Sequence, residues 1–303
     1  MAKPPRRRNY SQVRAPVRIA VQVISQTIRQ PDANNEQKRN AENERTIMLI
    51  KAGTVKGYKL ESLDGEIGKV KEFYFDDRHW TIRYLVADTG TWLTGRQVLI
   101  SPYALGDVNG EDQLIAINLT KKQIKDSPSL DSDKPVSRQF EEAYYGYHGW
   151  PTYWGGPYTW GSYPYIVRDP EKWREANQGG KAWDPHLRGT DGVSGHHVQA
   201  ADGEIGHVDD FIIDDETWAI RYLIVDTHNW WPGKKVLLSP RWIERVSWIE
   251  RKVFVDLSRE TIKQSPEFTE ESLLTRDYET GLHRHYNRQG YWVDELVAHE
   301  HTY

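Results

Sequence analysis

The feature that most constrains this chain is an internal repeat at a fixed offset of 138 residues. The five residues Asp64–Gly68, Asp-Gly-Glu-Ile-Gly, recur as Asp202–Gly206. From Gly57 to Pro102, 23 of 46 positions are identical to their partners without a gap. Self-similarity at a constant spacing indicates two copies of one structural unit. We therefore predict two domains of the same fold, at residues 48–128 and 190–266.

Each copy has the pattern of short strands joined by tight turns. The Asp-Gly pair at residues 64–65 favours a hairpin, because both turn positions tolerate positive φ. In the following strand, Ile67 and Val70 break the period of two, so we expect a β-bulge at Gly68. Each copy ends in a short helix, Thr120–Asp126 or Ser258–Gln264, with Thr or Ser as the N-cap. The predicted fold class is mainly β: two small β-barrels with short helices.

The strand that starts at Trp80 is apolar on both faces, with Tyr84 and Val86 on one and Leu85 and Ala87 on the other. Only one face can look into a small barrel. The second copy has the same pattern, and two identical patches on tethered copies are most simply buried against each other. We predict an intrachain pseudo-two-fold pair, with the outward residues of these two strands near the contact and the aromatic segment between the copies along its rim. The repeated Trp80 and Trp218 are predicted core anchors.

The repeated residues resemble the PRC-barrel family. The likeness rests on Gly57, Asp64–Gly68, Phe75–Asp77, Ile82–Val86 and Val98–Pro102, with their partners in the second copy. That family includes the cytoplasmic domain of the photosynthetic reaction-centre H subunit and the C-terminal domain of a ribosome-maturation factor. The chain is similar to tandem bacterial members with two barrels. The resemblance implies docking or assembly, with reaction-centre or electron-transport complexes as one class of partner, and implies no catalytic residues.

Composition narrows the function classes further. The 303 residues include no cysteine, which excludes disulfides and thiolate nucleophiles. Residues 1–47 hold ten Lys/Arg and four Asp/Glu, so the rest of the chain is acidic, which argues against nucleic acid as a partner. No run of about 20 apolar residues could span a membrane. We expect a soluble, cytoplasmic protein with a disordered leader at 1–47; a basic nucleic-acid arm or upstream sequence read in frame are the alternatives for the leader.

The predicted connector, residues 129–189, is rich in aromatic residues. Between Phe140 and Tyr165, 11 of 26 residues are aromatic, five are glycine and three are proline. The glycines and prolines argue against a regular helix, so we expect an irregular segment. It could cover the barrels, bind partners as an exposed segment, or stack bases. The candidate interaction residues are Tyr153, Trp154, Tyr158 and Trp160. Residues 267–303 are expected to form a C-terminal tail.

Repeated carboxylates are the main chemical candidates. Asp76-Asp77 and Asp214-Asp215 each follow a strand, where they can accept backbone N–H groups of the next turn. A divalent-cation site is the alternative. Arg83 and Arg221 are expected to pair with these carboxylates. In the tail, His283 and His285 would share one face of a strand, which is a weaker pattern for a metal site. We expect them instead to be solvent-exposed tail residues. We assign no catalytic residue and no cofactor.

Three classes of function remain. The leading hypothesis is a non-enzymatic soluble adaptor whose barrels and connector dock on another protein of unknown identity. The alternative is a small-ligand or divalent-metal binding module that uses the carboxylates and histidines. An enzyme is the third, and it would need a polar pocket with convergent titratable groups.

The leader yields a first prediction. If residues 1–47 lie outside the fold, deleting them changes the free energy of unfolding by less than about 0.5 kcal/mol, as for surface changes away from the core. Chemical denaturation of the full-length and shortened chains measures this difference. A larger loss would show that the leader packs on the domains.

Overall fold

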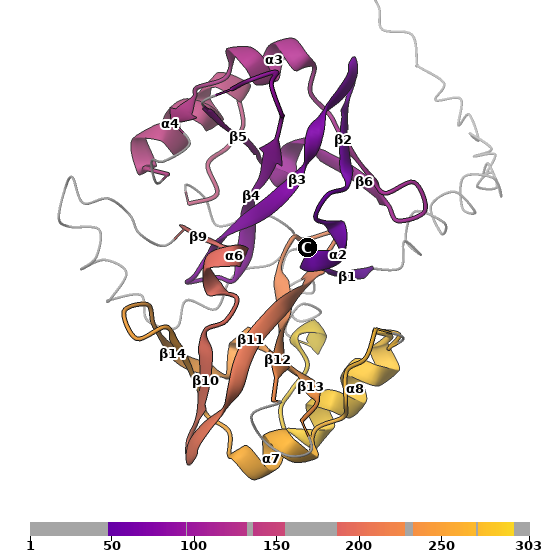
Figure 1. Cartoon of the computed structure of the whole chain (residues 1–303), viewed down its shortest axis with the longest axis vertical. Helices are drawn as coiled ribbons and strands as arrows, with labels where there is room; N and C mark the ends of the chain where they lie inside the picture. The colour runs from indigo at the N-terminus through magenta and orange to yellow at the C-terminus, as the bar shows by residue number, and fades with distance from the viewer. Residues whose placement is uncertain are drawn as a thin grey trace, which may run out of the picture. The chain divides into compact units, whose positions relative to one another are not determined.

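The computed structural model describes residues 48–94, 96–131, 136–154, 187–227, 233–270 and 272–293, which belong to one compact unit. The predicted leader lies outside these residues, as do Tyr158 and Trp160. Figure 1 shows the two repeats, the first in indigo to magenta and the second in orange to yellow.

The first repeat folds into one sheet with the strand order β6-β7-β2-β3-β4-β5-β8. Strands β2 and β7 pair in parallel, while the other neighbours along this order pair antiparallel. Its elements are β1 (Leu49–Lys51), α2 (Ala52–Val55), β2 (Lys59–Ser62), β3 (Gly65–Asp76), β4 (Thr81–Asp88), β5 (Arg96–Ile100), η1 (Pro102–Ala104), β6 (Leu105–Asn109), β7 (Leu114–Ile117), α3 (Lys121–Asp126), β8 (Leu130–Asp131) and α4 (Arg138–His148).

The second repeat has the equivalent strand order β13-β12-β11-β10-β15-β14, again with one parallel pair, β10 and β15. Its elements are β9 (Leu187–Gly189), α6 (Thr190–Val193), β10 (His197–Ala200), β11 (Gly203–Asp214), β12 (Ile220–Asp226), β13 (Lys235–Leu238), η2 (Pro240–Trp242), β14 (Ile243–Ser247), β15 (Lys252–Val255), α7 (Arg259–Gln264) and α8 (Arg276–His285). The predicted pair of similar β domains is confirmed.

Local sequence signals explain the turns of each sheet. The pairing of β2 with β3 shifts between Leu60 and Glu61, opposite Gly68, which confirms the predicted bulge. Gly68 has φ +140°, and a Cβ there would lie 2.1 Å from the carbonyl oxygen of Asp88, so no other residue fits. Thr120 caps α3 as predicted by accepting the N–H of Gln123, and Ser258 caps α7 in the same way.

The two repeats are joined by a reciprocal exchange of strands. Strand β1, the first element of the first repeat, pairs antiparallel with β11 of the second. Strand β9, the first element of the second repeat, pairs antiparallel with β3 of the first. The registers correspond at the 138-residue offset, since Tyr74 opposes Gly189 and Ile212 opposes Lys51. Each sheet therefore receives a strand from the other repeat (Figure 1).

A pair of equivalent residues marks the centre of this contact. Thr81 forms an antiparallel bridge with Ala219, its own partner in the repeat. The N–H of Ile82 donates to the carbonyl of Trp218 (2.8 Å), and the N–H of Ile220 donates to the carbonyl of Trp80 (2.7 Å). A residue that contacts its own equivalent lies on the two-fold axis. The two repeats thus form a pseudo-two-fold pair within the chain.

Aromatic side chains fill the space beside this axis. The ring of Phe75 stacks on Trp80 at 5.1 Å and meets Phe211 of the other repeat at 5.8 Å. The ring of Phe73 lies 6.1 Å from Trp218. Both tryptophans are buried, and they belong to one apolar core cluster that includes residues of both repeats. Their predicted role as core anchors agrees with this position, and the core is shared between the repeats.

The predicted contact face was wrong. Leu85 and Ala87 belong to the shared core, while Tyr84 and Val86 form a second cluster with Tyr144, Tyr145 and Tyr153. The outer face of β4 is therefore covered by the connector and not by the other repeat. The connector packs on this face instead of following the rim of the contact.

The prediction of an irregular connector was also wrong for residues 138–148, which form α4. Ser137 caps the helix by accepting the N–H of Phe140, and Gly149 ends it in the left-handed region at φ +70°. Tyr144 and Tyr145 are buried against β4. The helix forms because burial of these two rings outweighs the low helix propensity of Gly146.

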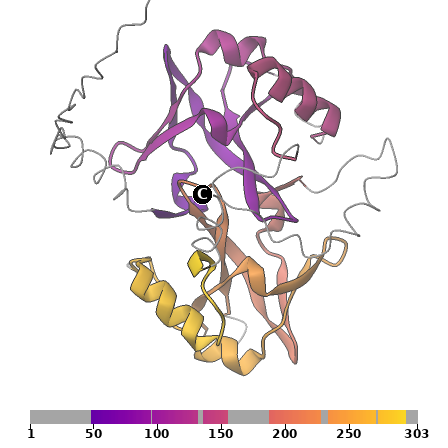
Figure 2. The same ribbon diagram turned by 180° about the vertical axis from the view of Figure 1, so that it is seen from behind.

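The second repeat carries the same helix, in residues expected to form a tail. Helix α8 starts after Thr275, which caps it as Ser137 caps α4 at the 138-residue offset. The offset also relates Glu141 to Glu279, and Tyr153-Trp154 to Tyr291-Trp292. The repeat thus continues to residue 292. Figure 2 shows α8 in yellow at the second repeat and α4 in magenta at the first.

The shared core makes a prediction about cooperativity. Trp218→Ala removes a buried ring that packs on Phe73 of the other repeat, so it lowers the free energy of unfolding by about 3–5 kcal/mol. Calorimetry should show one transition at a lower temperature. The control is Trp92→Ala in an exposed loop, expected within about 0.5 kcal/mol of the parent. Two transitions, of which only one shifts, would contradict the shared core.

Candidate functional site

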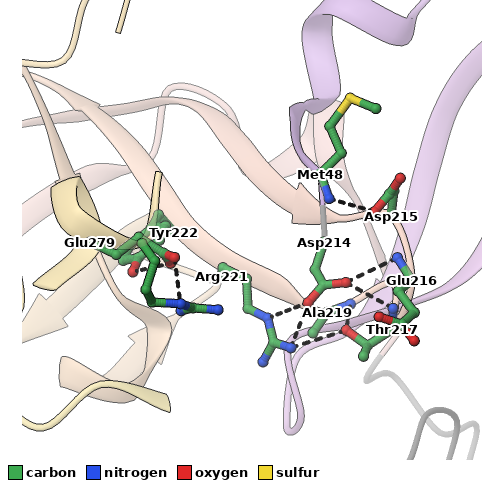
Figure 3. Close-up of polar contacts among 10 residues, drawn as sticks. Met48, Asp214, Asp215, Glu216, Thr217, Ala219, Arg221, Tyr222 and Glu279 are labelled. Carbon is green, nitrogen blue, oxygen red and sulfur yellow. Dashed lines mark hydrogen bonds and ion pairs between the residues drawn. The ribbon is translucent and has the colours of Figure 1, made fainter. Parts of the chain in front are cut away.

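The repeated carboxylates Asp76 and Asp214 are buried and hold the turn that follows β3 or β11. Asp214 Oδ1 accepts the N–H groups of Glu216 (3.0 Å) and Thr217 (2.9 Å). Its Oδ2 accepts from Arg221 Nε (2.9 Å) and Nη2 (2.6 Å), as Figure 3 shows. Asp76 likewise accepts the N–H of Arg78 at 2.9 Å and lies 3.4 Å from Arg83 Nη2. The predicted turn chemistry is confirmed for Asp76 and Asp214, and so is the predicted Asp–Arg pairing.

The neighbouring carboxylates, Asp77 and Asp215, bind the exchanged strands. Asp215 Oδ1 accepts the N–H of Met48, just before β1, at 2.9 Å (Figure 3). Asp77 Oδ2 accepts from Nε of Arg188, in β9, at 3.1 Å. Burial raises the pKa of Asp77 to about 6, although the Arg188 guanidinium acts in the opposite direction. The Asp-Asp motif thus combines a turn residue with a residue that holds the other repeat.

These contacts bear on the alternative of a metal site. Each of the four carboxylates has N–H donors as its partners. Within the ranges that the structure describes, no group of three His, Asp or Glu side chains could hold a metal ion.

A buried glutamate holds each covering helix in place. Glu141, on α4, accepts the hydroxyls of Tyr84 (3.2 Å) and Tyr153 (2.7 Å). Its partner Glu279, on α8, accepts the hydroxyl of Tyr222 at 2.8 Å (Figure 3). Both glutamates are 2% exposed, so they depend on these donors, because an unpaired buried carboxylate is costly.

A buried arginine lies beside each of these glutamate clusters. The guanidinium of Arg83 lies 4.1 Å from the centre of the Tyr153 ring, and that of Arg221 lies 4.0 Å from the Tyr291 ring. Each arginine also binds the carboxylate of the turn after β3 or β11, Asp76 or Asp214. One arginine side chain therefore links that turn to the tyrosine that follows the covering helix. Tyr153, proposed as an exposed interaction residue, is therefore buried, and Trp154 is half-buried against Tyr145.

The histidines predicted as a weak metal pair do not share a face. Both lie on α8, where residues two apart point in different directions. His283 is buried against Trp242 and Trp292, and its Nε2 lies 3.1 Å from the hydroxyl of Tyr222. His285 Nε2 lies 2.8 Å from the carbonyl of Thr261. The expectation of a solvated tail was wrong because α8 covers the outer face of β12.

The clearest difference between the repeats is an aromatic patch on the first, formed by Tyr103, Tyr147, His148 and Trp150. Tyr103 is 39% exposed and Tyr147 is 44% exposed, while the other two are half-buried. The Trp150 ring stacks with His148 (4.3 Å, 13°) and with Tyr103 (5.6 Å, 25°). The ring of Tyr147 meets His148 edge-on at 4.8 Å.

The equivalent positions in the second repeat are polar at three of four places. The 138-residue offset relates Tyr103 to Arg241, Tyr147 to His285 and Trp150 to Arg288. Arg288 binds Asp256 Oδ2 at 2.9 Å, so this surface is ionic. The fourth equivalent, Tyr286, is buried against Trp242. The aromatic residues of the connector are evident in the sequence, whereas this contrast becomes visible only when the repeat is followed past residue 266.

His283 yields a prediction about pH. Burial lowers its pKa from 6.5 to about 4, with Arg241 and Arg276 acting in the same direction. The unfolded chain therefore binds a proton that the folded chain does not between about pH 6.5 and pH 4, so stability falls as the pH falls through this window. His283→Gln, which does not titrate, makes stability less dependent on pH there.

Denaturation of both chains at pH 7 and pH 4.5 measures this effect. The control is His197→Gln, since His197 is exposed and pairs with Glu204 at the surface. An unchanged pH dependence in His283→Gln, with the fold intact, would show that other groups cause the acid loss.

Comparison with known proteins identifies the repeated unit. The model of the PRC-barrel domain matches residues 50–124 and residues 195–262. No curated protein matches the chain. Among the described helices, none has the length and apolar character needed to cross a membrane. Both matched ranges coincide with the repeated sheets, and the chain is therefore a PRC-barrel protein with two such domains in tandem.

Proposed function

We propose that this protein is a non-enzymatic adaptor that docks another protein through the aromatic patch of its first repeat. The observation that carries this proposal is the contrast between the surfaces beside the two covering helices. Helix α8 packs on its sheet although the second repeat has Arg241 in η2, His285 at the end of α8 and Arg288 after α8 where the first repeat has exposed or half-exposed rings. Docking of the helix therefore does not require an aromatic surface at these positions.

The chemistry of the patch favours a protein partner. Tyr and Trp are enriched where protein interfaces derive most of their binding energy, because each buries a large rigid area and keeps a polar group. The stacked rings are already ordered by their contacts with each other and with Tyr144, so little side-chain entropy is lost on binding. The repeated carboxylates have structural partners, which supports a binding role over acid–base catalysis.

The PRC-barrel resemblance adds a class of partner. Family members serve in docking and assembly, so reaction-centre or electron-transport complexes are candidate partners. The proposal itself rests on the patch, and the identity of the captured protein tests this narrower assignment.

The test is site-specific photo-crosslinking in lysate of the native host. A photoreactive phenylalanine analogue at position 147 should capture a specific protein, whereas the same analogue at the equivalent position 285 should not. The double variant Tyr103→Ser/Tyr147→Ser should reduce recovery of that protein at least tenfold in a pull-down, with a melting temperature close to that of the parent. Equal capture from positions 147 and 285, or full recovery by the double variant, would disprove docking at the patch.

A further inference from the structure

The exchanged strands leave each repeat dependent on a strand that it does not contain. Strand β3 pairs along residues 74–76 with β9, and β11 pairs along residues 212–214 with β1. Neither sheet receives this strand from its own repeat. Each acceptor edge is therefore complete only when a second repeat is present.

Nothing in these contacts depends on the two repeats belonging to one chain. The pairing consists of backbone hydrogen bonds in equivalent registers, the central bridge from Thr81 to Ala219, and rings that interlock across the axis. The first repeat ends its described contacts at Trp154 and the second begins them at Leu187. Residues 155–186 join the two repeats covalently. This covalent link keeps the second repeat of the same chain near the first, but the contacts themselves could equally form with the second repeat of another copy.

We infer that two copies of this chain can exchange repeats, so that the first repeat of each copy pairs with the second repeat of the other. The resulting dimer is closed and contains two copies of the interface already seen within one chain. It forms the same contacts as two monomers, so the balance depends on concentration. A tethered repeat acts at an effective concentration that dilute solutions of the free chain do not reach, which favours the monomer in dilute solution.

Exchange requires the shared core to open, because rings of both repeats meet across the axis. Folded monomers should therefore exchange slowly at room temperature. Chains that fold together at high concentration should be trapped in both forms. Exchange of repeats requires neither the aromatic patch nor the proposed partner.

The absence of cysteine allows a direct test with full-length chains. Thr81 and Ala219 are a bridge pair without hydrogen bonds between them, since the bonds run between their neighbours. Such pairs have Cα atoms about 4.5 Å apart, within the range of about 4.4–6.8 Å that a disulfide spans. One chain carries only Thr81→Cys. A second chain, with a tag of a different length so that the two can be told apart by size, carries only Ala219→Cys.

The two chains are unfolded together, refolded at high concentration and oxidised. Exchange places the thiol of the Thr81→Cys chain opposite the thiol of the Ala219→Cys chain. A disulfide-linked heterodimer should therefore exceed the disulfide-linked homodimer of the Thr81→Cys chain at least fivefold. Its yield should rise with the concentration during refolding. Chains that are folded separately and then mixed should give little heterodimer.

The double variant Thr81→Cys/Ala219→Cys is the positive control, and it should form an intrachain disulfide at low concentration. If that control closes but co-refolded single variants give no heterodimer above the homodimer level at any concentration, the repeats pair only within one chain and the inference is wrong.

Discussion

The hydrogen bonds around Thr81 and Ala219 are the constraint on which the rest of this structure depends. They place the two repeats about an axis on which equivalent residues meet, and Trp80 and Trp218 then enter a core that both repeats share. The Asp-Asp motif stabilises this arrangement from both sides, because one carboxylate holds the turn and the next binds the incoming strand. A small β domain buries limited apolar area alone, so a shared core gives each repeat stability that it lacks by itself.

The covering helices solve a second problem, the apolar outer face of the central strand. Each helix carries one buried glutamate, and each glutamate accepts a tyrosine hydroxyl from that strand. A buried carboxylate with too few donors would be strongly destabilising, so these bonds select one position of the helix on the sheet. The outer face of the central strand, β4 or β12, is thus shielded from water by a helix in both repeats. The ranges that match the PRC-barrel model end before both helices, which places these covers outside the common domain.

The covers also show where the two repeats differ. Their inner residues follow the same plan, from the N-cap to the Tyr-Trp pair, while the surface beside them carries the aromatic patch in the first repeat and Arg241, His285 and Arg288 at the equivalent positions of the second. Folding imposes similar demands on both helices, so it explains the inner residues but not the contrast outside. The aromatic patch differs from the equivalent surface of the second repeat, and folding does not require the difference. Such a surface is a good candidate for a binding site.

The sequence by itself determined the repeat, the mainly β fold, the bulge at Gly68, the capped helices α3 and α7, and the Asp–Arg pairs, because each depends on residues close in sequence or on identity at one offset. It also showed that the outer face of β4 needs a cover. Only the tertiary structure decided that α4 provides this cover, that β1 and β9 each pair with a strand of the other repeat, and that His283 is buried. These outcomes depend on which distant apolar surfaces fit together, and Gly146 and the neighbouring rings conceal the helical pattern of α4 until its packing against Tyr84 is known.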